Sequence, residues 1–172
     1  MSATTPEARR LAFMTLALTH AEKCIGNATA FCVGAVLVDS SLILATGYSR
    51  EHPGNTHAEQ VCIAKLLSGA VTTIPQVEGP EKEYDLYTTM EPCSKRLSGN
   101  IPCTDLIVQY NASEERREKG LGRIRRVYVG VREPVTFVKK NVGEEKLVES
   151  GVEFIHITGL EERILEVARM GH

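Results

Sequence analysis

The sequence lacks two features that would tie it to a membrane or to export. No apolar run approaches the roughly 18 to 20 residues that a membrane-spanning helix needs. The N-terminal stretch MSATTPEARR also lacks the short apolar segment that follows the cations of a secretory signal. We therefore expect a cytoplasmic protein.

An excess of charge of one sign is also missing. The 20 Lys and Arg residues nearly balance the 22 Asp and Glu residues, which leaves a formal net charge of -2. A surface built to neutralise nucleic-acid phosphates or to lie on anionic lipid would be basic. The composition therefore argues against nucleic acid or a membrane as the partner.

The chain does have enough apolar residues to form a core without disulfide crosslinks. With 172 residues, of which 42% are hydrophobic, it has the size and composition of one domain over 1–172, and it contains no internal repeat. Its five cysteines are an odd number in a chain without an export signal. This cysteine usage favours reduced thiols or metal ligands over a disulfide framework.

Apolar patterning divides the chain into alternating helices and strands. Thr5 and Pro6 predict a helix start, and the following apolar run continues the helix toward Gly26. Short apolar runs predict strands at 33–38, 42–48, 84–90, 124–131 and 152–157. Further helices are expected over 57–70, in a stretch ending at Ser150, and from Leu160 onward.

The order of these elements predicts the fold class. An opening hairpin followed by alternating strands and helices favours a three-layer α/β/α fold with a central mixed sheet of about five strands. The segment EERREK (114–119) mixes charges of both signs and is expected to be exposed surface.

Two predicted junctions carry residues suited to metal chemistry. His57 lies at the start of a helix, and Cys93 and Cys103 follow the strand at 84–90. Two thiolates and one imidazole make three ligands for zinc, and a site with three protein ligands keeps its fourth position for water. Glu59 lies two residues from His57, where it can reach that water and carry a proton without binding the metal.

Simpler interpretations compete with this one. Cys93 and Cys103 could be core thiols, or they could belong to a closed structural zinc site with a fourth ligand such as His52. The remaining cysteines, which stand in apolar periodic contexts, are expected to be small core residues: Cys24, Cys32 and Cys62.

The motif HAE, followed by PC and a second cysteine, resembles the signature of the zinc-dependent cytidine deaminase superfamily. Most members separate the two cysteines by two residues, whereas SKRLSGNIP stands between Cys93 and Cys103 here. The longer insertion resembles the pyrimidine deaminases of riboflavin biosynthesis, and above all their fungal branch. The similarity extends from VGAVLV through NTHAE and TMEPCSKRLSGNIPC to YVGVREP.

This resemblance implies an activity and a set of residue roles. The expected reaction is zinc-dependent hydrolytic deamination of 2,5-diamino-6-(5-phosphoribitylamino)pyrimidin-4(3H)-one at C2, with one Zn²⁺ per chain held by His57, Cys93 and Cys103. Glu59 would transfer the proton to a ring nitrogen and then to the departing ammonia. The residues expected to contact the substrate are Thr29, Asn55, Ala58, Ser94, Lys95, Arg96 and Asn100.

Within that last set, the loop between the cysteines is assigned to the sugar and the phosphate. Lys95 and Arg96 would meet a phosphate monoester, and Ser94 and Asn100 would bond to hydroxyls of the sugar chain. Lys95 and Arg96 could equally be cations of a solvated loop.

Other function classes fit the sequence less well. A nucleotide or tRNA deaminase would be expected to have the short cysteine spacing and, for RNA, a basic face. A non-catalytic zinc module would not need Glu59. We expect a homodimer, because members of the superfamily commonly associate. Since the chain ends at His172, we expect no reductase domain, and we expect reduction to precede deamination.

Overall fold

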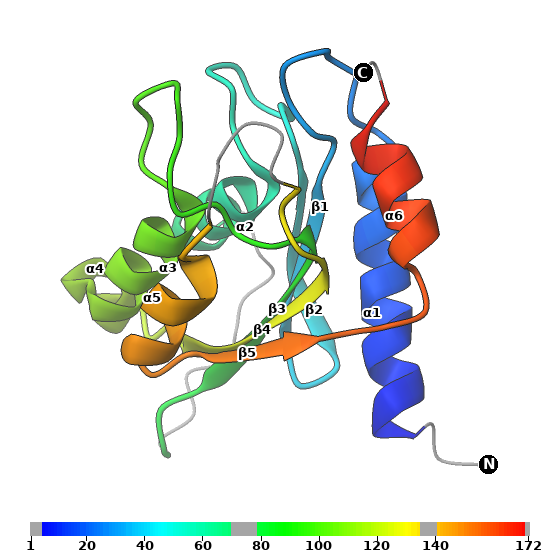
Figure 1. Ribbon diagram of the computed structural model, residues 1–172. Helices are drawn as coiled ribbons and strands as arrows, with labels where there is room; N and C mark the ends of the chain where they lie inside the picture. The colour runs from blue at the N-terminus through cyan, green and yellow to red at the C-terminus, as the bar shows by residue number, and fades with distance from the viewer. Residues whose placement is uncertain (1–4, 70–78, 135–140, 171–172) are drawn as a thin grey trace.

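Five strands form one mixed sheet in the order β2-β1-β3-β4-β5 within the part of the chain that the computed structural model describes, residues 5–69, 79–134 and 141–170 (Figure 1). The strands are β1 (Gly34–Asp39), β2 (Leu42–Tyr48), β3 (Glu83–Met90), β4 (Arg123–Val131) and β5 (Glu153–His156). Each of them falls on a strand that the sequence pattern predicts.

Strand direction changes at the centre of the sheet. β1 runs antiparallel to both β2 and β3, whereas β3, β4 and β5 run parallel to one another. Parallel neighbours need a crossover, and here the crossovers are helical. The helices α3 (Cys103–Ala112) and α4 (Glu114–Glu118) connect β3 to β4, and α5 (Gly143–Glu149) lies between β4 and β5.

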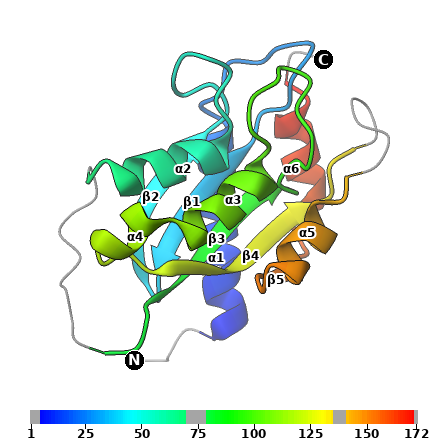
Figure 2. The same ribbon diagram turned by 90° about the vertical axis from the view of Figure 1, so that its left-hand side faces the viewer.

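Helices cover both faces of the sheet, as Figures 1 and 2 show. One face carries α1 (Pro6–Ala21) and α6 (Glu161–Ala168), and the other carries α2 (Ala58–Leu67), α3 and α5. This arrangement confirms the expected three-layer α/β/α fold with a mixed sheet. No described helix has the length and apolar character needed to cross a membrane.

The central strand β1 shows why the sheet accepts helices on both sides. Val36 and Val38 belong to the core cluster that α1 closes, and Ala35 and Leu37 belong to the cluster under α2. Side chains alternate between the two faces of a strand, so a strand that is buried on both faces is apolar throughout.

Three expectations need correction. The segment 114–119 is not simply exposed, because it forms α4 and buries Arg116, whose guanidinium pairs with Glu81. The helix α3 was not anticipated from the sequence. In β2, the apolar run at 42–48 favours a buried strand, but Leu42 and Ile43 are exposed, because β2 is an edge strand.

Close packing of α1 on β1 depends on Gly34. A Cβ atom at this position would lie 1.9 Å from the carbonyl oxygen of Ala17 and 2.5 Å from the nitrogen of Ala21. Both are backbone atoms of the helical segment, so a side chain would force the helix away from the sheet.

We therefore expect Gly34→Ala to lower the free energy of unfolding by about 1 to 3 kcal/mol, the usual cost of overpacking a core. Urea denaturation followed by circular dichroism would measure the change. Gly79→Ala is the matched control, because a Cβ atom at Gly79 meets nothing within 4 Å. Equal denaturation midpoints for the two variants would contradict the proposed packing constraint.

Candidate functional site

Three side chains from different parts of the chain meet at one end of the sheet. The possible metal-binding atoms of His57, Cys93 and Cys103 all lie within 4.8 Å of one another. Among the described residues, these three are the only group of His, Cys, Asp and Glu that could hold a metal ion in this way. The donor set of two sulfurs and one imidazole fits zinc and leaves a coordination position open.

The secondary structure positions each of these side chains at a helix start or strand end. His57 is the N-cap of α2, and its backbone N–H lies 3.4 Å from the Oε1 atom of Gln60. Cys103 is the first residue of α3, and Cys93 follows the end of β3 by three residues. His52 does not belong to the group, so the described residues provide no fourth protein ligand.

The two thiols have different proton affinities. The hydrogen bond from the Cys103 side chain lowers the pKa of Cys93 to about 4, and His57 acts in the same direction. The pKa of Cys103 rises, because its proton is held by Cys93 and because it is buried. The Cys103 backbone N–H also donates to the Cys93 sulfur at 3.4 Å. Cys93 is therefore ready to bind as a thiolate.

Glu59 lies beside these ligands in a buried position. One carboxylate oxygen accepts a hydrogen bond from Thr88 Oγ1 at 3.1 Å, and the other lies 3.4 Å from the Cys103 sulfur. Burial raises the pKa of this carboxyl group, since the charged form loses its solvation. A carboxyl group with a raised pKa can both take and return a proton near neutral pH.

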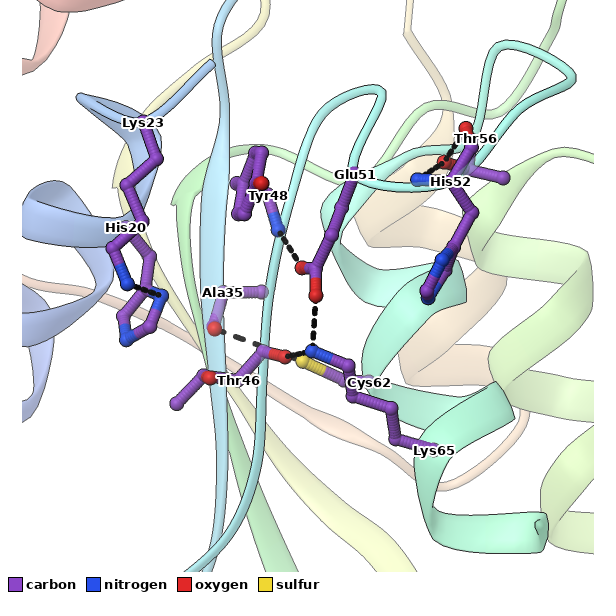
Figure 3. Close-up of polar contacts among 10 residues, drawn as sticks. All are labelled: His20, Lys23, Ala35, Thr46, Tyr48, Glu51, His52, Thr56, Cys62 and Lys65. Carbon is purple, nitrogen blue, oxygen red and sulfur yellow. Dashed lines mark hydrogen bonds and ion pairs between the residues drawn. The ribbon is translucent and has the colours of Figure 1, made fainter. Parts of the chain in front are cut away.

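The loop that ends at His57 is fastened to the neighbouring elements through Glu51 (Figure 3). One oxygen of Glu51 accepts from the Tyr48 backbone at 3.2 Å, and the other forms an ion pair with Lys65 of α2. Lys65 also donates to the Thr46 carbonyl at 2.8 Å, so β2 and α2 are joined through one ammonium group. This contact fixes where the loop enters α2.

The ligands border a pocket that contains several of the expected substrate contacts. Thr29, Asn55, Lys95 and Arg96 line it together with His57, Glu59 and Cys93. Ala58, Ser94 and Asn100 are not among the lining residues. Ser94 instead accepts a hydrogen bond from the Val142 backbone at 3.0 Å, and Asn100 donates to the Gly54 carbonyl at 3.2 Å.

The pocket also has wall residues to which the sequence analysis assigned no role. They include Arg50, Glu91 and Glu133. Asn141 donates to the carboxylate of Glu133 at 2.8 Å. Burial, and to a smaller extent the charge of the nearby Cys93, raises the pKa of Glu133 to about 7. The only signal in the sequence is the position of Glu133 two residues after the predicted strand at 124–131, where polar residues often belong to a site.

Comparisons with known proteins agree with this geometry. Residues 8–115 match the family model described as the cytidine and deoxycytidylate deaminase zinc-binding region. A Schizosaccharomyces pombe protein named diaminohydroxyphosphoribosylamino-pyrimidine deaminase is 41% identical over 160 residues. The alignment covers 93% of this chain but 35% of that protein, so the chain spans about a third of this relative's length.

Solved structures give the same result. The Aspergillus oryzae Rib2 deaminase in complex with DARIPP superposes with a TM-score of 0.79 at 34% identity, covering 95% of this chain and 92% of that one. A Thermotoga maritima deaminase/reductase superposes with a TM-score of 0.69 at 30% identity, over 95% of this chain and 40% of that one. A deoxycytidylate deaminase from cyanophage S-TIM5, at 23% identity and a TM-score of 0.55, covers 88% of this chain and 98% of that one and shows the shared fold alone.

We expect Cys103→Ser to lower the zinc content from about one ion per chain toward zero, because a serine hydroxyl is a far weaker ligand than a thiolate. Elemental analysis of the purified variant would measure it. Glu59→Gln is the control, since it alters a neighbouring group without removing a ligand, and it should keep its zinc. Full zinc retention by Cys103→Ser would remove Cys103 from the ligand set.

Proposed function

Since the chain belongs to the family of zinc-binding cytidine and deoxycytidylate deaminases, we propose that it removes an amino group from a pyrimidine by zinc-dependent hydrolysis. The observation that carries this proposal is the position of Glu59, which lies in the same pocket as His57 and Cys93 and within contact of Cys103. A structural zinc site would need no buried carboxyl group beside its ligands.

The proposed substrate is 2,5-diamino-6-(5-phospho-D-ribitylamino)pyrimidin-4(3H)-one, an intermediate of riboflavin biosynthesis. The similarity to a Rib2 deaminase bound to DARIPP and to a fungal diaminohydroxyphosphoribosylamino-pyrimidine deaminase supports it. Cations line the pocket, as a phosphorylated substrate requires.

In the proposed reaction, the oxygen of water replaces the amino nitrogen at C2, and ammonia leaves. Zinc, when bound to His57, Cys93 and Cys103, supplies a Lewis acid that makes water acidic enough to act as a nucleophile near neutral pH. Glu59 takes one proton of the attacking water and passes it to a ring nitrogen, and it then takes the second proton of that water and gives it to the departing amino group. The hydrogen bond from Thr88 holds its carboxyl group in place for both transfers.

The ribosylamino form of the intermediate is a second candidate, because the name of the Schizosaccharomyces pombe relative contains that form. We favour the ribitylamino form on the resemblance to the fungal branch. A flexible polyol also needs more hydrogen-bonding partners than a furanose, and Lys95 and Ser98 of the loop at 94–100 line the pocket and offer them.

A single deaminase domain over 1–172, a homodimer and a cytoplasmic location complete the proposal. The composition supports the single domain and the location, and the frequent association of superfamily members supports the dimer. Light scattering on the purified protein would measure the oligomeric state.

Glu59→Gln should reduce the rate of ammonia release by roughly 10²- to 10⁴-fold, because the amide cannot carry the proton. The comparison with wild type requires samples of equal zinc content. A zinc-loaded Glu59→Gln protein with near-normal turnover would exclude Glu59 as the proton carrier.

The substrate proposal predicts a higher kcat/KM for the ribitylamino compound than for the ribosylamino compound. Direct competition between the two on the purified protein, with cytidine and deoxycytidylate as further substrates, would measure the preference. A higher value for the ribosylamino compound would identify that form as the substrate, and turnover of cytidine alone would overturn the assignment to riboflavin biosynthesis.

A further inference from the structure

Three cations line the pocket: Arg50, Lys95 and Arg96. Arg50 comes directly after the buried Ser49 at the end of β2, whereas Lys95 and Arg96 belong to the loop between the cysteines. If the substrate carries a phosphate, as the proposed function requires, these three residues do not have equal access to it. Their hydrogen bonds decide which of them can bind it.

The guanidinium of Arg96 is already engaged by the protein. Nη1 donates to Gln60 Oε1 at 3.1 Å and to the Ile101 carbonyl at 3.3 Å, and Nη2 donates to the Asn55 carbonyl. Both terminal nitrogens therefore fasten the loop to α2 and to the turn before it. A phosphate could take these donors only by releasing the loop.

Arg50 keeps side-chain N–H donors that no described residue accepts. Of its side-chain nitrogens, Nη2 alone forms hydrogen bonds with described residues, at 2.7 Å from the Ile25 carbonyl and at 2.9 and 3.6 Å from the sulfurs of Cys24 and Cys32. Its Nε and Nη1 atoms form no hydrogen bond with a described residue. No carboxylate of the described residues pairs with it either, so its charge is not cancelled.

The sulfur contacts position this cation without neutralising it. Burial, helped by the neighbouring Cys32, raises the pKa of the Cys24 thiol to about 12, so the thiol stays neutral at physiological pH. A carboxylate in the same place would hold the guanidinium but would also compete with a phosphate for it. The neutral Cys24 thiol holds the guanidinium and leaves its charge available.

The backbone of Arg50 is fixed as well. Its φ angle of 63° lies in the left-handed region, which is uncommon for a residue with a side chain. Its N–H donates to the Thr56 carbonyl at 2.7 Å and closes the loop that leads to His57. A residue that is held in an unfavourable conformation at a pocket wall is often one whose side chain must point in a set direction.

We propose that Arg50 binds the phosphate of the substrate, positioned by Cys24 and Cys32, and that Lys95 assists it from the loop between the cysteines while Arg96 holds that loop in place. Both bidentate edges of a guanidinium include Nη2, which the protein occupies here, so the phosphate takes a single charge-assisted hydrogen bond from the free Nη1 atom. Cys24 and Cys32 are positioning residues in this arrangement, although the sequence alone suggests only core thiols.

The test compares the phosphorylated substrate with its dephosphorylated analogue. Arg50→Gln should lower kcat/KM for the phosphorylated compound by roughly 10- to 100-fold, and it should lower that for the analogue far less. Arg96→Gln should lower kcat/KM for both substrates by similar factors, because it loosens the loop. Arg163→Gln is the matched control, since Arg163 pairs with Glu22 and does not line the pocket.

The positioning role has its own variants. Cys24→Ala should raise KM for the phosphorylated substrate with little change in kcat, and Cys24→Ser should restore it, because a hydroxyl can also accept from the guanidinium. Equal losses of Arg50→Gln on both substrates, at wild-type zinc content and melting temperature, would overturn the proposal.

A measurement on the wild-type protein does not depend on whether the variants fold. Inorganic phosphate should protect Arg50, but not Arg163, from modification by an arginine-specific dicarbonyl reagent, as mapped by mass spectrometry. Lack of protection at Arg50 would also contradict the proposal. If wild type deaminates none of the pyrimidines, the proposed function fails, and this protection experiment still decides the role of Arg50.

Discussion

The structure depends on bringing one imidazole and two thiols within 4.8 Å of one another from three segments of the chain. Cys93 reaches this point because β3 lies in the middle of the sheet, and His57 and Cys103 reach it because α2 and α3 both begin at the same edge. A shift of one residue in the register of β3 would turn its side chains to the opposite face. The relative positions of the three ligands therefore depend on how the helices pack on the sheet.

The long insertion between the cysteines contributes mainly by holding this site together. Ser94 accepts from the Val142 backbone, Arg96 binds the Asn55 carbonyl, and Asn100 donates to the Gly54 carbonyl. These contacts join the insertion to the segments before α2 and α5. Polar residues that look like substrate contacts in the sequence can thus be used by the backbone, because backbone groups in loops have no partners from a helix or a sheet. Lys95 is exposed and forms no ion pair with a described residue, so it stays available at the pocket wall.

Much of the fold could be predicted, because apolar periodicity and cap residues are local signals. Thr5 caps α1 as expected, with its hydroxyl accepting from the Ala8 backbone at 3.2 Å. The ligand group followed from motif spacing. The burial of Arg116 could not be predicted, since it depends on Glu81 and on the Leu121 carbonyl. The pocket position of Arg50 could not be predicted either, because the thiols that hold it are 18 and 26 residues away in sequence.

Acidic and cationic side chains both line the pocket. Burial and the charge of Cys93 both raise the pKa values of Glu59 and Glu133. Both carboxyl groups therefore lie at the end of the pocket that holds the metal ligands. The cations Arg50 and Lys95 lie on two separate chain segments that line the same pocket. Ring amino groups are donors and favour acidic acceptors, whereas phosphate oxygens favour cations. If the phosphate binds at Arg50 as proposed, the amino-bearing ring is therefore expected at the end of the pocket where Glu59 lies.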